Sequence, residues 1–330
     1  MGLWMSHPLV YGPDPIVLEG HEGSRYWVHD PYTFTGNVAI DERLSGYPVV
    51  IFQPPGRPAE ETPIVVGLQG MAAPYQWNGF LVPTLLGMGI ACVLFDTPLA
   101  GERSLARKSD GNVVGEVIPL LKQQAVIDVS LVPRLVDAVA RDFRTALGIA
   151  SARHRLHDPR VALFGVSLGT LLAAHAFVRD GTGTRLLGTL GHADLYRFAR
   201  SYTPSVAPYI LSGPGRLLGK LAALFLGPVV PAGMSFLGVL RDLCVGGDHC
   251  TAANPMEFAD RVASNRRVRF LVGAEDLLVK PSDAIECARR FPDGACYVVP
   301  GLGHGTSRFG PSFVEHVRVF IGTQLGDWKH

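Results

Sequence analysis

Eight short runs in this sequence have the composition of β-strands, and most of them are apolar throughout instead of alternating with polar residues. Strands of this kind have both faces of their sheet covered, which is typical of a mostly parallel sheet between helices. Segments with helical patterns lie between the runs. The eight runs cover residues 24–30, 47–53, 63–69, 90–96, 161–166, 186–191, 268–273 and 295–300. We therefore predict an α/β fold with a mostly parallel eight-stranded sheet flanked by helices.

One interval between the predicted strands is too long for a single crossover. Residues 196–262 contain apolar helical segments of their own, so we assign them to a helical cap inserted over the sheet. Residues 1–195 and 263–330 then form the core domain. The cap contains an uncharged run from Leu221 to Leu240, but Gly227 and Pro228 would break a spanning helix near its middle. We expect no transmembrane span.

The charge balance of the chain argues against a nucleic-acid partner. Thirty Lys plus Arg residues face 29 Asp plus Glu residues, for a net charge of +1, and no basic run stands out. The N-terminus lacks the basic start and apolar segment of a signal peptide, so we expect a cytoplasmic protein. Among five cysteines, Cys244 and Cys250 are close enough for a local disulfide, with free thiols in a reducing compartment as the alternative. The sequence does not indicate an oligomeric state.

Ser167 stands at the junction between a predicted strand and a predicted helix, in the string Gly165-Val166-Ser167-Leu168-Gly169. A turn this sharp needs residues without bulk two positions before and after the serine. The hydroxyl then projects above the carboxyl edge of the sheet. A G-x-S-x-G string is weak evidence by itself, but its position between strand and helix makes it strong.

A serine hydroxyl needs a base to take its proton, and the base needs an acid to hold its tautomer. His304 follows the last predicted strand, between two glycines, and Asp276 follows the strand before it. The order Ser167, Asp276, His304 along the chain, each beyond a different strand, is what this geometry requires. The 28 residues between Asp276 and His304 leave room for one helix and one strand.

Other residues compete for these roles. Glu275 is adjacent to Asp276, and Asp194 follows the sixth predicted strand, so both are alternative acids. His192 and His175 are the alternative bases, although His175 lies two helical turns beyond the serine.

Several further residues have structural interpretations beside the functional ones. Asp96 and Arg103 are interpreted as residues that shape a turn. Tyr75 and Trp77 either line an acyl pocket or belong to the core.

Four motifs together resemble the α/β-hydrolase family, and the resemblance spans the chain apart from the cap. They are "GVSLG" at Ser167, "GAEDLLV" at Asp276, "GLGHG" at His304, and "FDTPLAGERS" after the fourth predicted strand. The resemblance implies an oxyanion hole made of two backbone N–H groups, those of Leu168 and Met71. Many members have His-Gly where this chain has Gln69-Gly70.

The sequence therefore predicts a serine hydrolase that cleaves carboxylic esters with short to medium acyl groups through an acyl-enzyme. Ser167, His304 and Asp276 form the predicted triad, and a small-molecule ester is the predicted partner. Metal-ligand spacing and dinucleotide fingerprints are missing from the sequence, so we expect no cofactor and no metal. Acyl transfer or peptide hydrolysis with the same triad, and a non-catalytic hydrolase-like receptor, are the alternatives.

Overall fold

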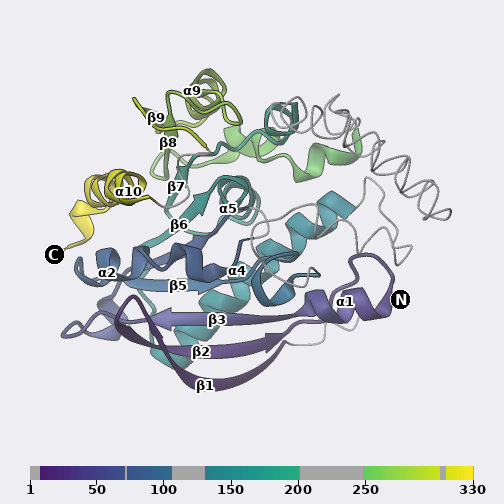
Figure 1. Ribbon diagram of the computed structural model, residues 1–330, viewed down its shortest axis with the longest axis vertical. Helices are drawn as coiled ribbons and strands as arrows, with labels where there is room; N and C mark the ends of the chain where they lie inside the picture. Colours follow the sequence, from purple (N-terminus) through teal and green to yellow (C-terminus); the bar gives the residue numbers. More distant parts are fainter. Residues whose placement is uncertain (1–7, 71–72, 106–130, 201–247, 305–309, 330) are drawn as a thin grey trace.

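A computed structural model of the chain describes residues 8–70, 73–105, 131–200, 248–304 and 310–329. Within these ranges the structure is built on one nine-stranded sheet in the order β1-β2-β3-β5-β4-β6-β7-β8-β9 (Figure 1). The strands are β1 Leu9–Leu18, β2 His21–His29, β3 Gly46–Phe52, β4 Ile64–Leu68, β5 Ala91–Phe95, β6 Val161–Val166, β7 Arg185–Thr189, β8 Arg267–Gly273 and β9 Gly294–Val299.

The sheet is mostly parallel, as predicted. Strands β4 to β9 all run parallel to one another. At one end of the sheet, β1 pairs antiparallel with β2, β2 with β3, and β3 with β5. The predicted number of eight strands is wrong by one, because β1 was not recognised. Pro13 and Pro15 within β1 read as turn signals, but β1 is an edge strand, where proline is tolerated. Its register with β2 also shifts between Tyr11 and Asp14.

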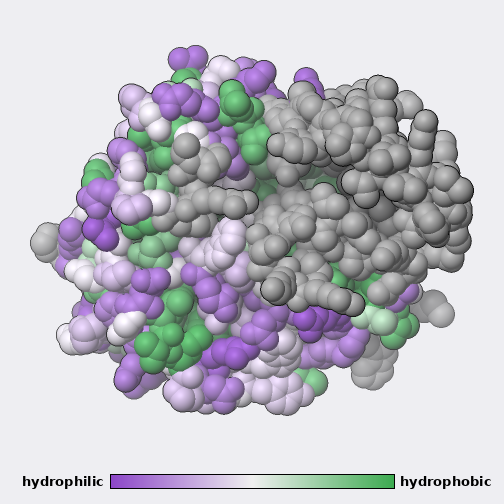
Figure 2. All heavy atoms as spheres, viewed as in Figure 1, coloured by the Kyte–Doolittle hydropathy of each residue, from purple (hydrophilic) through white to green (hydrophobic). Residues whose placement is uncertain are grey.

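Helices cover both faces of the sheet, which explains the uninterrupted apolar runs of its strands. The helices are α1 Val38–Ser45, α2 Leu81–Leu86, α4 Leu131–His154, α5 Leu168–Arg179, α9 Pro281–Arg289 and α10 Pro311–Gln324. One large apolar cluster joins the sheet to α4 and α5, and a second joins its other face to α2 and α10. Strand β6 serves both clusters, because Leu163 packs into the first and Phe164 into the second. On the surface in Figure 2, by contrast, hydrophilic and hydrophobic residues of the described ranges are interspersed.

Of the predicted cap, residues 201–247 lie outside the described residues, and the run from Leu221 to Leu240 lies outside them too. The described C-terminal part of that interval forms two 3₁₀ helices, η4 Asp248–Ala253 and η5 Pro255–Arg261. Met256 and Ala259 of η5 are buried in the same cluster as α4 and α5. No helix in the described ranges combines the length and hydropathy that crossing a bilayer requires.

The turn after β5 is anchored in the interior by Arg103, the last residue of the 3₁₀ helix η3 Gly101–Arg103. Arg103 is 1% exposed, and its guanidinium pairs with Asp142 of α4 and donates through Nε to the carbonyl oxygen of Leu44 at 2.6 Å. It also lies over the Tyr47 ring, 4.5 Å from the ring centroid. Asp96 and Arg103, interpreted from sequence as turn residues, do lie at the two ends of this turn.

Candidate active site

Ser167 lies between the end of β6 and the start of α5 with a backbone that few non-glycine residues adopt. Its φ is 53° and its ψ is −120°. Two hydrogen bonds hold it there: the Ser167 N–H donates to the Thr189 carbonyl at 2.8 Å, and the Thr170 N–H donates to the Ser167 carbonyl at 2.9 Å. A backbone held in this region is a form of strain that structures concentrate at functional sites.

The two flanking glycines are required by close backbone approach. A Cβ at Gly165 would collide with the backbone of Gly169 and Thr170, and a Cβ at Gly169 would collide with the carbonyl of Gln69. The glycines two positions before and after Ser167, predicted from sequence, are therefore required sterically. Gly169 lets the start of α5 pack against the loop that follows β4.

His304 reaches the serine from the loop after β9. Its Nε2 lies 3.0 Å from Ser167 Oγ, and its Nδ1 lies 2.9 Å from Asp276 Oδ2. Among the described residues, His304 is the only hydrogen-bond partner of the serine hydroxyl. Since a carboxylate can only accept, the proton of the imidazole belongs on Nδ1, so Nε2 is the acceptor in the hydrogen bond with the hydroxyl.

Asp276 is held by the backbone of its own loop. The residue is 3% exposed, and its Oδ1 accepts from the N–H groups of Leu278 and Val279 at 2.9 and 2.8 Å. One carboxylate oxygen is thus occupied by the backbone while the other faces His304. Sequence reasoning missed these two donors, although an Asp followed at two and three residues by available N–H groups is a known local motif.

The alternative acids have other partners. The Glu275 carboxylate accepts from the Gly301 N–H at 3.0 Å, which links the acid loop to the turn before His304. Asp194 accepts from the N–H groups of Tyr196 and Arg197 at 3.0 and 3.1 Å, as a residue at the start of a helical turn does. Only Asp276 among the three is joined to His304.

The alternative bases are buried away from the serine hydroxyl. His175, on α5, is 1% exposed and lies 3.4 Å from the Arg179 guanidinium. His192 is fully buried, and its Nδ1 accepts from the Asp194 N–H at 3.1 Å. Burial is the main reason that the pKa of each of these imidazoles is lowered to about 4.

A candidate oxyanion hole lies between α5 and the loop after β4. Leu168 is the first residue of α5, so its N–H has no acceptor within the helix. Gly70 passes close to the serine, since a Cβ on it would lie 3.5 Å from Ser167 Cβ. Met71, the other predicted donor, lies outside the described residues.

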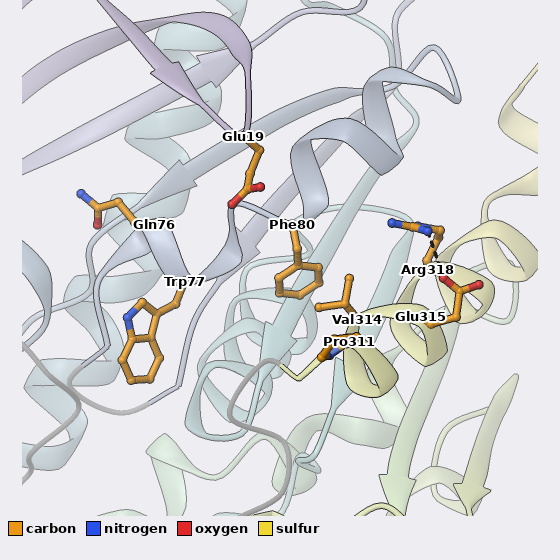
Figure 3. A pocket seen from close by; sticks show the side chains of 8 residues that line it. All are labelled: Glu19, Gln76, Trp77, Phe80, Pro311, Val314, Glu315 and Arg318. Atoms are coloured by element: carbon orange, nitrogen blue, oxygen red, sulfur yellow. Dashed lines mark hydrogen bonds and ion pairs between the residues drawn. The ribbon is translucent and has the colours of Figure 1, made fainter.

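The two aromatic residues after this loop have different roles. Tyr75 is buried in the core, whereas Trp77 is 36% exposed and lines a groove of about 700 Å³ between the 3₁₀ helix η2 Tyr75–Asn78 and the start of α10 (Figure 3). The groove is lined by Glu19, Gln76, Trp77, Phe80, Pro311, Val314, Glu315 and Arg318. Nothing in the described residues places it against Ser167, so it is not part of the proposed site.

Comparisons with known structures agree with this architecture. An acetyl xylan esterase from Paenibacillus sp. R4 is 18% identical, with a TM-score of 0.56 over 96% of this chain and 87% of that one. A monoglyceride lipase variant from Saccharomyces cerevisiae is 15% identical, with a TM-score of 0.55 over 86% of this chain and 92% of the lipase chain. An esterase from Pyrococcus furiosus is 16% identical, with a TM-score of 0.53 over 97% of this chain and 92% of the esterase chain. The chain has the α/β-hydrolase fold.

At these identities the comparisons establish the α/β-hydrolase fold alone. No family model matches the chain, and no curated protein matches its sequence. The roles of individual residues therefore rest on the geometry of the site itself.

The buried histidines predict a loss of stability in acid. In the folded chain His192 stays neutral down to about pH 4, whereas in the unfolded chain it gains a proton near pH 6.5. The free energy of unfolding that depends on neutral His192 is therefore fully present above pH 6.5. It decreases by about 3 kcal/mol as the pH falls from 6.5 toward 4. In His192→Asn the amide oxygen can still accept from Asp194, but nothing titrates. The deficit of this variant in unfolding free energy, measured with urea, should shrink from pH 7 to pH 4.5. A deficit that does not change with pH would contradict the prediction.

Proposed function

We propose that the chain is a carboxylic-ester hydrolase that works through an acyl-enzyme on Ser167. The single observation that carries the proposal is the hydrogen-bonded series Ser167–His304–Asp276, with distances of 3.0 and 2.9 Å. A nucleophile, a base and an orienting acid in contact form the general signature of covalent catalysis. The names of the similar structures, two esterases and a lipase, support esters as the substrate class.

In the first half of the reaction, Ser167 Oγ attacks the ester carbonyl carbon while His304 Nε2 accepts the hydroxyl proton. The carbonyl oxygen becomes an oxyanion. His304 is now an imidazolium, stabilised by the Asp276 carboxylate at its Nδ1. It returns the proton to the alcohol oxygen as the carbon–oxygen bond breaks, which leaves the acyl group on the serine.

In the second half, His304 accepts a proton from a water molecule that attacks the acyl-enzyme. A second oxyanion forms at the same position. Its collapse breaks the bond to Ser167 Oγ, which regains the proton from His304, and the carboxylic acid leaves. Because the oxyanion forms twice, the N–H groups proposed to bind it, those of Leu168 and Met71, serve both halves.

Replacement of the nucleophile or the base should abolish turnover without unfolding the chain. We expect Ser167→Ala and His304→Ala each to lower kcat for p-nitrophenyl butyrate by about 10⁴- to 10⁶-fold, and the double variant to lose little more. A fluorophosphonate probe should label Ser167 of the wild type, as located by mass spectrometry, and should not label Ser167→Ala. Near-wild-type turnover in Ser167→Ala would refute the proposed function.

The acid can be tested with two isosteric variants. Asp276→Asn should lower kcat by about 10³- to 10⁴-fold, because an amide facing Nδ1 favours the wrong imidazole tautomer. Asp194→Asn is the matched control, since Asp194 also accepts from backbone N–H groups, whereas the carboxylate hydrogen-bonded to His304 among the described residues is that of Asp276. We expect it to retain activity within about threefold. The reverse ranking of the two variants would transfer the role of the acid to Asp194.

We also propose that the acyl group is short to medium in length, and this part rests on sequence alone. The uncharged run from Leu221 to Leu240 offers more apolar surface than a short insertion needs. If part of it faces Ser167, each acyl methylene that enters contributes up to about 0.8 kcal/mol of transfer free energy.

That contribution predicts a specific dependence on chain length. The ratio kcat/KM for p-nitrophenyl esters should rise about threefold to fourfold per methylene from acetate and then level off or fall before palmitate. Steady-state kinetics on the ester series measures it. A maximum at acetate followed by steady decline would mean that the cap closes the pocket instead of lining it.

A further inference from the structure

The proposed acid and base lie on two neighbouring loops at the carboxyl edge of the sheet. Strands β8 and β9 pair in parallel, so the loops that follow them emerge side by side (Figure 1). Residues 274–280, which follow β8, are here called the acid loop, and residues 300–304, which follow β9, the histidine loop. The acid and the base stay in contact only if these two loops keep a fixed relation to each other.

Glu275 fastens the acid loop to the histidine loop with both its backbone and its side chain. Its N–H donates to the Leu302 carbonyl at 3.1 Å, and its carboxylate Oε1 accepts from the Gly301 N–H at 3.0 Å. One residue earlier, the Ala274 N–H donates to the Val299 carbonyl at 2.8 Å. Glu275 therefore engages two consecutive residues of the histidine loop, directly after the point where β9 ends.

The side-chain bond holds the part of the histidine loop that the core does not hold. Leu302 is 4% exposed, and its carbonyl packs so closely on Gly273 that a Cβ there would lie 1.9 Å from the oxygen. Gly301, by contrast, is exposed and has a φ of +74°, a conformation open mainly to glycine. Open space lies where its Cβ would be, so packing does not fix it.

A displacement of the histidine loop acts directly on the base. His304 follows Leu302 by two residues, and its ring makes two hydrogen bonds at once, at 3.0 Å to Ser167 and at 2.9 Å to Asp276. Proton transfer requires heavy atoms within hydrogen-bond distance of each other. A small misplacement of reacting groups can therefore cost far more in rate than the contact that was lost.

We propose that Glu275 is a positioning residue for His304, which it serves by holding the Gly301 N–H and so fixing the start of the histidine loop. The inference rests on the proposed function, because that function makes His304 the base. Two adjacent acids then have separate tasks: Glu275 holds the loop, and Asp276 holds the imidazole. Since Glu275 acts through the loop and not on the ester, its loss should lower kcat and leave KM nearly unchanged.

The test begins with Glu275→Ala in the full-length chain and p-nitrophenyl butyrate as substrate. The bond to Gly301 is exposed to solvent, so we expect kcat to fall only about 5- to 30-fold, with KM within about threefold of wild type. The rate at which the fluorophosphonate probe labels Ser167 should fall by the same factor, because that reaction also needs His304. The downfield proton resonance of His304 Nδ1–H, assigned by its loss in His304→Ala, should broaden as the proton exchanges faster with water.

Two further variants separate the hydrogen bond of Glu275 from its charge. Glu275→Gln keeps an acceptor oxygen at the same reach but removes the charge, so its kcat should stay within about threefold of wild type. Glu275→Asp keeps the charge but is one methylene too short to reach the Gly301 N–H, so it should resemble Glu275→Ala. The reverse ranking would mean that the charge of Glu275 acts on His304, and it would overturn the positioning role.

Asp293→Ala is the matched control at the other end of the same two strands. Asp293 directly precedes β9, and its Oδ1 accepts from Arg269 Nη2 of β8 at 2.8 Å. This carboxylate also ties the two strands together, but away from the triad. We expect Asp293→Ala to lose thermal stability while its kcat and labelling rate stay within about threefold of wild type. An equal loss of kcat in Asp293→Ala and Glu275→Ala would point to general loosening of the strand pair and would overturn the inference.

Failure of the inference and failure of the proposed function give different results. Wild-type kcat and labelling rate in Glu275→Ala would overturn the inference and leave the proposed function intact. Absence of hydrolysis and of probe labelling in the wild type would instead refute the proposed function.

Discussion

The strained backbone of Ser167 is the constraint around which the candidate site is organised. A serine at φ 53° and ψ −120° costs about 1–3 kcal/mol and persists only where its surroundings fix it. Here they do so through the Thr189 carbonyl, the first turn of α5, and two glycines that let backbone segments touch. The same contacts place Gly70 against the serine. The backbone conformation of Ser167 and the position of the loop after β4 therefore depend on the same contacts. A larger residue at position 165 or 169 would disturb both.

The parallel sheet explains why residues far apart in sequence meet at this serine. Strands β4 to β9 run in one direction, so the loops that follow them all emerge at one edge. Ser167 follows β6, Asp276 follows β8 and His304 follows β9. The order of strands then decides which loops are neighbours: β4 pairs with both β5 and β6, which brings Asp96 and Ser167 to either side of the same loop. Helices on both faces leave this edge as the place where polar groups from several loops can gather.

Features that depend on single segments could be predicted from the sequence, whereas features that depend on the position of a segment in the sheet could not. The fold class followed from apolar strands and intervening helices, and the eight predicted runs coincide with strands β2 to β9. Strand β1 was missed because its prolines are compatible with a strand only at a sheet edge, and edge position is a tertiary property. The three residues Ser167, Asp276 and His304 could be selected from their places after strands. The backbone donors of Asp276 could not, because Leu278 and Val279 contribute N–H groups that every residue type except proline carries.

Backbone N–H groups donate hydrogen bonds to the carboxylates of both Asp276 and Asp96, which are buried at this edge of the sheet. The two carboxylates differ in how these donors are distributed between their oxygens. In Asp276 one oxygen takes two N–H groups from its own loop, which leaves the other oxygen for His304. In Asp96 each oxygen takes one N–H group from a different loop, so none is left for a side chain. The first pattern suits an acid that must stabilise a transient imidazolium, and the second suits one that must hold two loops in register. The distribution of donors, more than burial or residue type, therefore distinguishes these two carboxylates: Asp276 keeps one oxygen for a side chain, whereas both oxygens of Asp96 are taken by the backbone.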